Sequence, residues 1–240
     1  MILRWTLSIV AVLFAAQADA GIALTPHTAE YKVKISVVSG HLSTALQKTE
    51  DGYIANHVIK PTGLSKLITR GTMDVTSEFS SEADGIKPHR FRSIDTIRDD
   101  PDVDIFFDWE KNEAAGAVGD THVALSLDGI SYDNVSIQYE LMHDLLNGRP
   151  SQHYTLFDVD KMREVDVSNA GTQDIKTRAG TYKTVGIRHQ KDGSSRVTTL
   201  WCAEELGYLP VIIEQHRKGK LNFRATLLSY TPTEPSVVDD

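Results

Sequence analysis

The residue types that perform nucleophilic catalysis occur in this chain without the spacing that catalysis requires. The nearest approach to a Gly-x-Ser-x-Gly elbow is the run 63–67, which lacks the second glycine of that strained strand-to-helix turn. The single cysteine, Cys202, stands in an apolar stretch with no histidine nearby in the sequence. A buried, unreactive thiol is therefore the favoured interpretation of Cys202.

Metal-ligand spacing is also missing from the sequence. The nine histidines are scattered singly, without a His-Glu-x-x-His motif, although folding could still bring distant ones together. The acidic run 99–104 resembles a calcium loop at first sight. Ile105 and Lys111 stand where that loop needs a glycine and a bidentate acid, so a solvated acidic turn is the better interpretation.

Carboxylates are plentiful but have no assigned roles. Asp158 and Asp160 share one face of a predicted strand, and Glu204 and Glu205 lie close to a tryptophan, yet neither pair has a partner that would separate acid from base. No glycine-rich phosphate loop is found. We therefore predict a protein without catalytic residues, metal or cofactor. An enzyme whose site is assembled from distant strands remains the least favoured alternative.

Composition limits the partners. The 240 residues are 40% hydrophobic and 24% charged, which is typical of a globular chain. Asp and Glu outnumber Lys and Arg by 33 to 25, giving a formal net charge of −8. This acidic balance argues against a nucleic acid partner, whose phosphates must be neutralised by basic residues.

The first twenty residues have the features of a secretory signal peptide. Arg4 supplies a positive start, an apolar run follows, and Ala18-Asp19-Ala20 is a typical cleavage site. The apolar run is too short for a bilayer-spanning helix, and no later segment is long and apolar enough to be one. We expect cleavage after Ala20, one domain over residues 21–230, a disordered tail over 231–240, and a periplasmic location.

Most of the chain alternates between apolar and polar residues. Tyr31, Val33 and Ile35 alternate with lysines and serine, which is the period-two pattern of a half-buried strand. Similar short segments, separated by turn signals such as Asp51-Gly52, continue to residue 230. These segments predict a mainly β fold: one large curved antiparallel sheet, or a partly open barrel.

One segment has helical periodicity instead. Within residues 134–147, Val135, Tyr139, Met142 and Leu146 recur at helical spacing, and Gly148 follows as a stop signal. Asp133 or Asn134 is suited to cap the start of the helix. Such a helix could plug or line the concave face of the sheet, or it could cover a sheet edge; the sequence favours neither.

Several segments resemble the DUF3108 family, a group of exported bacterial proteins of unknown function. The resemblance spans about residues 29–230 and is most specific in the C-terminal third. The matching segments are 29–31, 50–53, 84–88, 133–139, 144–145, 177–184, 201–203 and 208–211. Cys202 departs from the pattern Trp-x-Ala…Leu-Pro-Val in having a cysteine at x. The resemblance implies a β-rich periplasmic protein and no known activity.

Two interpretations of the apolar strand residues stay open. They could fill a solid core, which is the favoured case, or line a cavity that binds a lipid or other apolar molecule. The candidate residues for the wall of such a site are Tyr139, Met142, Arg196, Trp201 and Tyr208. The leading functional hypothesis is a non-enzymatic apolar-ligand binder. The alternative is a structural or interaction protein of the cell envelope that contacts another envelope protein.

Overall fold

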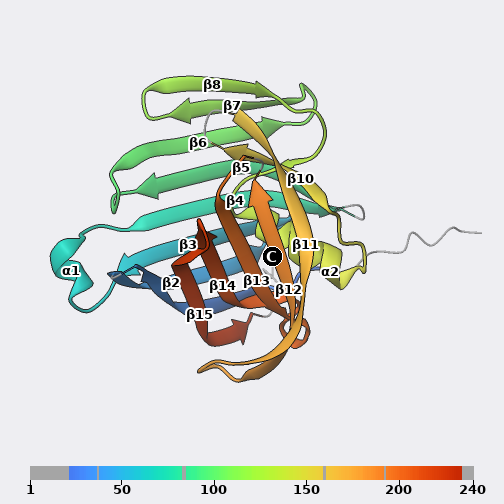
Figure 1. The fold of residues 1–240 in the computed structure, drawn as a ribbon. Coiled ribbons are helices and arrows are strands. Elements are labelled where there is room, and N and C mark those ends of the chain that lie inside the picture. Colours follow the sequence, from blue (N-terminus) through green and yellow to red (C-terminus); the bar gives the residue numbers. More distant parts are fainter. Residues whose placement is uncertain (1–21, 37, 83–84, 159–160, 192, 234–240) are drawn as a thin grey trace, which may run out of the picture.

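The computed structural model describes residues 22–36, 38–82, 85–158, 161–191 and 193–233. The predicted signal peptide lies outside the described residues. Described strands form one sheet in the order β8-β7-β6-β5-β4-β3-β2-β1-β15-β14-β13-β12-β11-β10-β9 (Figure 1). The strands are β1 (His27–Ile35), β2 (Val38–Lys48), β3 (Tyr53–Pro61), β4 (Met73–Glu82), β5 (Gly85–Asp95), β6 (Asp100–Asp108), β7 (Glu113–Val118), β8 (Thr121–Ser126), β9 (Ser131–Tyr132), β10 (His153–Asp158), β11 (Lys161–Lys176), β12 (Thr181–Lys191), β13 (Arg196–Ala203), β14 (Leu209–Arg217) and β15 (Lys220–Pro232).

The first and last strands pair in the middle of this sheet. His27 of β1 lies opposite Pro232 of β15, and the ladder runs antiparallel along both strands. From this centre, β2 to β8 extend in one direction and β14 to β9 in the other. Among the strand pairs that the structure describes, only β9 and β10 are parallel, and a helix connects these two strands. The predicted large antiparallel sheet is confirmed.

Several strands differ from the sequence expectation. The alternation predicts short strands, but β11 runs through 16 residues, with a register shift between Asn169 and Gly171. β9 has only two residues and carries no period-two signal. β15 continues to Pro232, and the Thr233 N–H donates to the Pro26 carbonyl, so the ordered chain extends into the expected tail.

The sheet curves strongly instead of lying flat. Strand pairs contain register shifts at several places, for example between Trp201 and Cys202 of β13 and between Gln215 and His216 of β14. Each such bulge bends its strand and increases the local twist, and a sheet this wide cannot remain both open and flat. We call β2 to β8 and β14 to β9 the two arms of the sheet. The two arms therefore wrap around a common interior (Figure 1).

Helix α2 (Ser136–Leu146) occupies this interior, as one of the two sequence interpretations expected. It begins where the Asp133 carboxylate accepts hydrogen bonds from the N–H groups of Val135 (2.7 Å) and Ser136 (2.8 Å). The same carboxylate accepts a 2.6 Å bond from the Ser77 hydroxyl of β4. Asp133 thus caps the helix and joins it to the sheet. The predicted helix over 134–147 is confirmed with slightly shorter ends.

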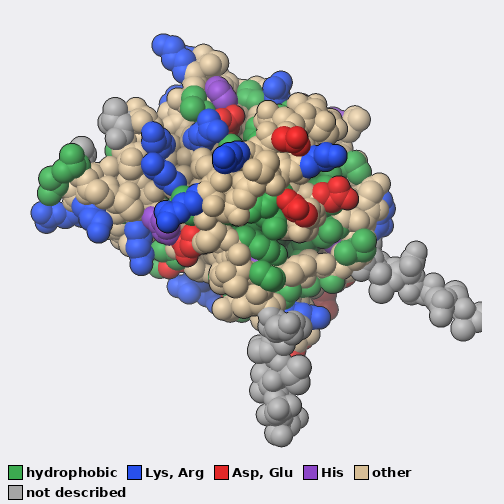
Figure 2. Space-filling model, turned by 90° about the horizontal axis from the view of Figure 1, so that it is seen from below, with side chains coloured by type: hydrophobic (Ala, Val, Ile, Leu, Met, Phe, Trp, Pro, Cys, Tyr) green, Lys and Arg blue, Asp and Glu red, His purple; other side chains and the backbone are tan. Residues whose placement is uncertain are grey.

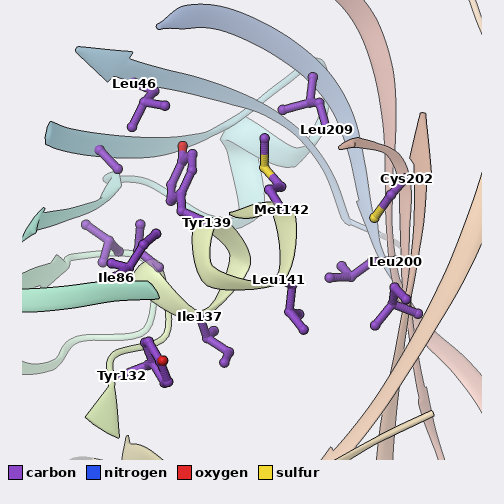
Figure 3. Packing of buried hydrophobic residues seen from close by; sticks show 14 of the residues in the cluster. Leu46, Ile86, Tyr132, Ile137, Tyr139, Leu141, Met142, Leu200, Cys202 and Leu209 are labelled. Carbon is purple, nitrogen blue, oxygen red and sulfur yellow. The ribbon is translucent and has the colours of Figure 1, made fainter. Parts of the chain in front are cut away.

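The buried face of α2 packs against both arms. Figure 3 shows Tyr139 and Met142 directed towards the region of Leu46 and Leu209, and Leu141 towards Leu200. Cys202 lies in the same core, and burial raises the pKa of its thiol to about 12. The expected burial of Cys202 is confirmed.

Two carboxylates on α2 tie the helix to opposite arms of the sheet. Glu140 accepts a 2.8 Å hydrogen bond from the Ile86 N–H of β5. Asp144, one helical turn later, accepts a 2.6 Å bond from the Tyr154 hydroxyl of β10. Gly85 stands beside this contact with a φ of 142°, which favours glycine, and a Cβ atom at this position would lie 2.8 Å from a Glu140 carboxylate oxygen.

A short helix, α1 (Ser65–Ile68), projects from one end of the molecule (Figure 1). Its residue Leu67 and the preceding Leu64 are 78% and 80% exposed. Within the described chain, no helix is both long and apolar enough to cross a bilayer.

Candidate functional site

A cavity of about 980 Å³ lies between α2 and the inner faces of the two arms. The helix contributes Val135, Ile137 and Leu141 to its wall, so part of the interior is filled by α2 and part is hollow. The favoured expectation of a filled core holds for the buried residues packed around α2, but not for the hollow beside it. Strand alternation explains the difference, because a curved sheet directs every second side chain inwards whether or not those side chains meet.

The deeper walls of the cavity are mainly apolar. Both arms contribute aliphatic and aromatic side chains, which face each other across the hollow. These residues are Leu42, Ile59, Met73, Val75, Phe91, Val103, Leu156, Val165, Leu200, Ile213 and Phe223. A cavity of this size and lining matches the typical ligand pocket, for which roughly 300–1,000 Å³ is usual.

Polarity increases along the paired strands β13 and β14. Leu200 lies opposite Ile213, Thr198 opposite Gln215, and Arg196 opposite Arg217, and all six line the cavity. The Gln215 amide donates a weak 3.4 Å hydrogen bond to the Thr198 hydroxyl. Since inward-facing residues are two apart, the sequence Arg-x-Thr-x-Leu sets charged, polar and apolar levels one after another.

Ion pairs occupy two parts of the cavity rim. Arg98 contacts Asp95 at 2.6 Å and Asp100 at 3.1 Å. Across the cavity, Asp158 accepts from Arg163 at 2.5 Å and from Lys191 at 3.0 Å. Burial alone would raise the pKa of Asp158, but the hydrogen bonds from Lys191 and Arg163 hold that pKa below its usual value.

Two histidines face the cavity below the rim. Burial lowers the pKa of His189 to about 4, and the nearby Lys191 contributes to the shift. Burial, assisted by His27, lowers the pKa of His57 to about 4 as well. Both imidazoles are therefore neutral at neutral pH, so the charge near the cavity is confined to its rim.

The structure separates the five residues that the sequence nominated for a ligand wall. Arg196 lies on the cavity rim. Tyr139 and Met142 are buried on α2, where the Tyr139 hydroxyl lies 3.3 Å from His57 Nε2. Trp201 packs over Gly186, and Tyr208 lies in the connection between β13 and β14, directly before Leu209. Neither side chain lines the cavity.

The nomination missed Arg217, Thr198, Gln215 and Lys191. The signal for Arg217, Thr198 and Gln215 is alternation along β13 and β14, which places every second residue from Arg196 and from Arg217 on one face, whereas Lys191 lies at the end of β12. Trp201 is an odd number of residues from Arg196 and so belongs to the other face. The family-like motifs that contain Trp201 and Tyr208 do not reveal this parity.

Other groups suited to catalysis have structural partners. A second hollow of about 480 Å³ is lined by Tyr132, Glu140, Asp144 and Tyr154, among other residues. Glu140 and Asp144 are the carboxylates that hold α2, and the third acid, Glu164, accepts a hydrogen bond from the Thr155 hydroxyl. Among the residues that the structure describes, no group of three or more His, Cys, Asp or Glu side chains could hold a metal ion.

The family model described as "Protein of unknown function (DUF3108)" matches residues 27–224, which span the sheet, α2 and most of the cavity wall. The chain belongs to the DUF3108 family. Comparison of this DUF3108 chain with curated proteins gives no match.

Solved structures share the fold of this DUF3108 protein. A β-barrel-like protein of domain of unknown function DUF1849 from Brucella abortus is 16% identical, with a TM-score of 0.58 over 88% of this chain and 99% of that one. A protein from Bacteroides fragilis, described as exported and as having a YmcC-like fold, is 11% identical, with a TM-score of 0.35 over the same shares. The Brucella structure supports the β-barrel-like architecture and carries no information on ligands.

Proposed function

We propose that this DUF3108 protein is a non-enzymatic periplasmic protein that binds a lipid or other apolar molecule in the cavity beside α2. The observation that carries the proposal is the cavity itself, about 980 Å³ in volume, to whose wall both arms of the sheet and α2 contribute aliphatic and aromatic side chains. Burying a hydrocarbon chain against such walls is favourable by about 25 cal/mol per Å² of apolar surface removed from water.

Native mass spectrometry of the protein purified from periplasm tests this function. We expect a co-purifying apolar molecule, identified after organic extraction, and binding of the hydrophobic dye N-phenyl-1-naphthylamine to the emptied protein. Thr198→Trp places a large ring inside the cavity and should weaken dye binding by about tenfold or more, because a blocked pocket loses its apolar contacts.

The matched control is Val197→Trp, on the same strand but absent from the cavity lining. It should bind the dye as the unmodified protein does. Equal dye binding by Thr198→Trp, or an emptied protein that binds no dye, would contradict the proposed function.

The periplasmic location follows from the signal-like sequence of residues 1–20. N-terminal sequencing of the protein recovered from the envelope fraction should give a first residue of Gly21. Recovery of the full chain beginning at Met1 in the cytoplasmic fraction would contradict this location.

The exposed leucines of α1 favour a second candidate function, in which the protein contacts another envelope protein. Figure 2 shows this region as an apolar projection at the left edge of the molecule, with Lys and Arg side chains beside it. Exposed apolar patches of this kind often mark interaction sites. A Leu64→Ser/Leu67→Ser variant that retains dye binding but loses a cross-linked partner in cells would support this function.

A further inference from the structure

The rim of the cavity carries more positive than negative charge. Its described lining includes five cationic side chains, Arg98, Arg163, Lys191, Arg196 and Arg217, and three acidic ones, Asp95, Asp100 and Asp158. The chain as a whole has a formal net charge of −8. The cavity entrance therefore has the opposite balance to the rest of the molecule and attracts anions.

The acidic side chains of the rim are already engaged. Asp95 and Asp100 pair with Arg98, and Asp158 pairs with both Arg163 and Lys191. Arg196 and Arg217 make no ion pair with any described residue. Both arginines are exposed at the rim, where a ligand can reach them.

These two arginines lie directly opposite each other on β13 and β14. Like charges in this cross-strand position destabilise a sheet, so the arrangement gains nothing for the fold. Two adjacent guanidinium groups do suit one anion, because each can donate two parallel hydrogen bonds to a carboxylate or phosphate.

The side chains below the arginines change from polar to apolar. Thr198 and Gln215 form the next level, and Leu200 and Ile213 the level beneath. We infer that the cavity binds an anionic amphiphile, whose carboxylate or phosphate lies between Arg196 and Arg217 and whose hydrocarbon tail extends past Leu200 towards α2. This inference rests on the proposed apolar-ligand function and adds the class of ligand.

Matched probes with the same hydrocarbon chain test the inference. Titration calorimetry of the emptied protein with laurate, dodecyl phosphate and dodecanol compares two anionic heads with a neutral one. We expect an anionic probe to bind about tenfold or more tightly than dodecanol, and the tighter of the two identifies the head group. This advantage should shrink as the salt concentration rises, because the rim is exposed to solvent.

The variant Arg196→Gln/Arg217→Gln should bind laurate, dodecyl phosphate and dodecanol with equal affinity. Arg188→Gln is the charge control, since this arginine is an exposed β12 residue outside the cavity lining, and it should retain the preference. Equal binding of all three probes by the unmodified protein, or a preference that survives in the double variant, would overturn the inference and leave the apolar-ligand function standing. Failure of all three to bind would overturn both.

Discussion

At the residue scale, the repulsion between Arg196 and Arg217, which lie opposite each other at the rim, should lower the free energy of unfolding, and this effect can be measured without any ligand. Arg217→Gln removes one of two like charges that face each other across β13 and β14. We expect the free energy of unfolding to rise by about 0.2–1 kcal/mol, as is usual for relief of cross-strand repulsion. Urea denaturation of the emptied protein measures the change.

Arg224→Gln is the comparison for this prediction. Arg224 pairs with Glu214 at 3.0 Å and lies one strand away, so its removal takes away an attraction instead of a repulsion. The free energy of unfolding should fall slightly or stay unchanged. If Arg217→Gln destabilises the protein as much as Arg224→Gln does, repulsion between Arg196 and Arg217 does not lower the stability.

The two cavity histidines predict a pH dependence of stability. Their folded pKa values of about 4 lie below the usual 6.5, so the unfolded chain takes up protons more readily than the folded protein. Their contribution is complete above pH 6.5 and is lost as pH falls from 6.5 towards 4. We expect a loss on the order of 2 kcal/mol, measured by urea unfolding at several pH values.

His189→Gln should flatten this pH dependence in part, since one of the two titrating groups is removed. Carboxylates with pKa values near 4 also titrate at the lower end of this window, so the difference between the unmodified protein and His189→Gln isolates the contribution of the histidine. A stability that is constant between pH 6.5 and 4 in the unmodified protein would contradict the prediction.

At the scale of elements, α2 is held by polar contacts to both arms of the sheet. Asp144→Ala leaves the buried Tyr154 hydroxyl without its carboxylate acceptor, which should lower the free energy of unfolding by about 1–3 kcal/mol. Adding Tyr154→Phe to this variant should cost less than the sum of the two single changes. Thermal or urea unfolding of the four proteins measures the coupling, and strictly additive losses would mean that the bond contributes no stability.

The elements were largely predictable from local patterns. Alternation identified most strands, and the spacing of Val135, Tyr139 and Met142 identified α2, because each pattern depends only on neighbours in the chain. Which residues share the cavity depends on strand register and bulges, such as the shift between Trp201 and Cys202. The sequence does not encode these features locally, so it named Arg196 as a candidate for the ligand wall but not Arg217, which lies opposite it on β14.

At the scale of the whole molecule, the sheet provides a long wall and α2 determines how much of the interior remains open. The arms meet the helix through Glu140 and Asp144, and the hollow remains on the side of Val135, Ile137 and Leu141. A wide sheet with one internal helix can therefore hold both a packed core and a cavity. The composition alone could not distinguish this arrangement from a completely filled interior.

The pairing of β1 with β15 also has a consequence for folding speed. All other neighbouring strands are consecutive in the chain, whereas the central pair joins its two ends, and the outer strands β8 and β9 are consecutive but not paired. A circular permutant that begins at Gly129 and links Thr233 to Ile22 would make every pairing sequential. Topology with fewer distant contacts folds faster, so this permutant should refold more rapidly than the natural order in stopped-flow experiments. Equal or slower refolding would show that closing the central pair does not limit the rate.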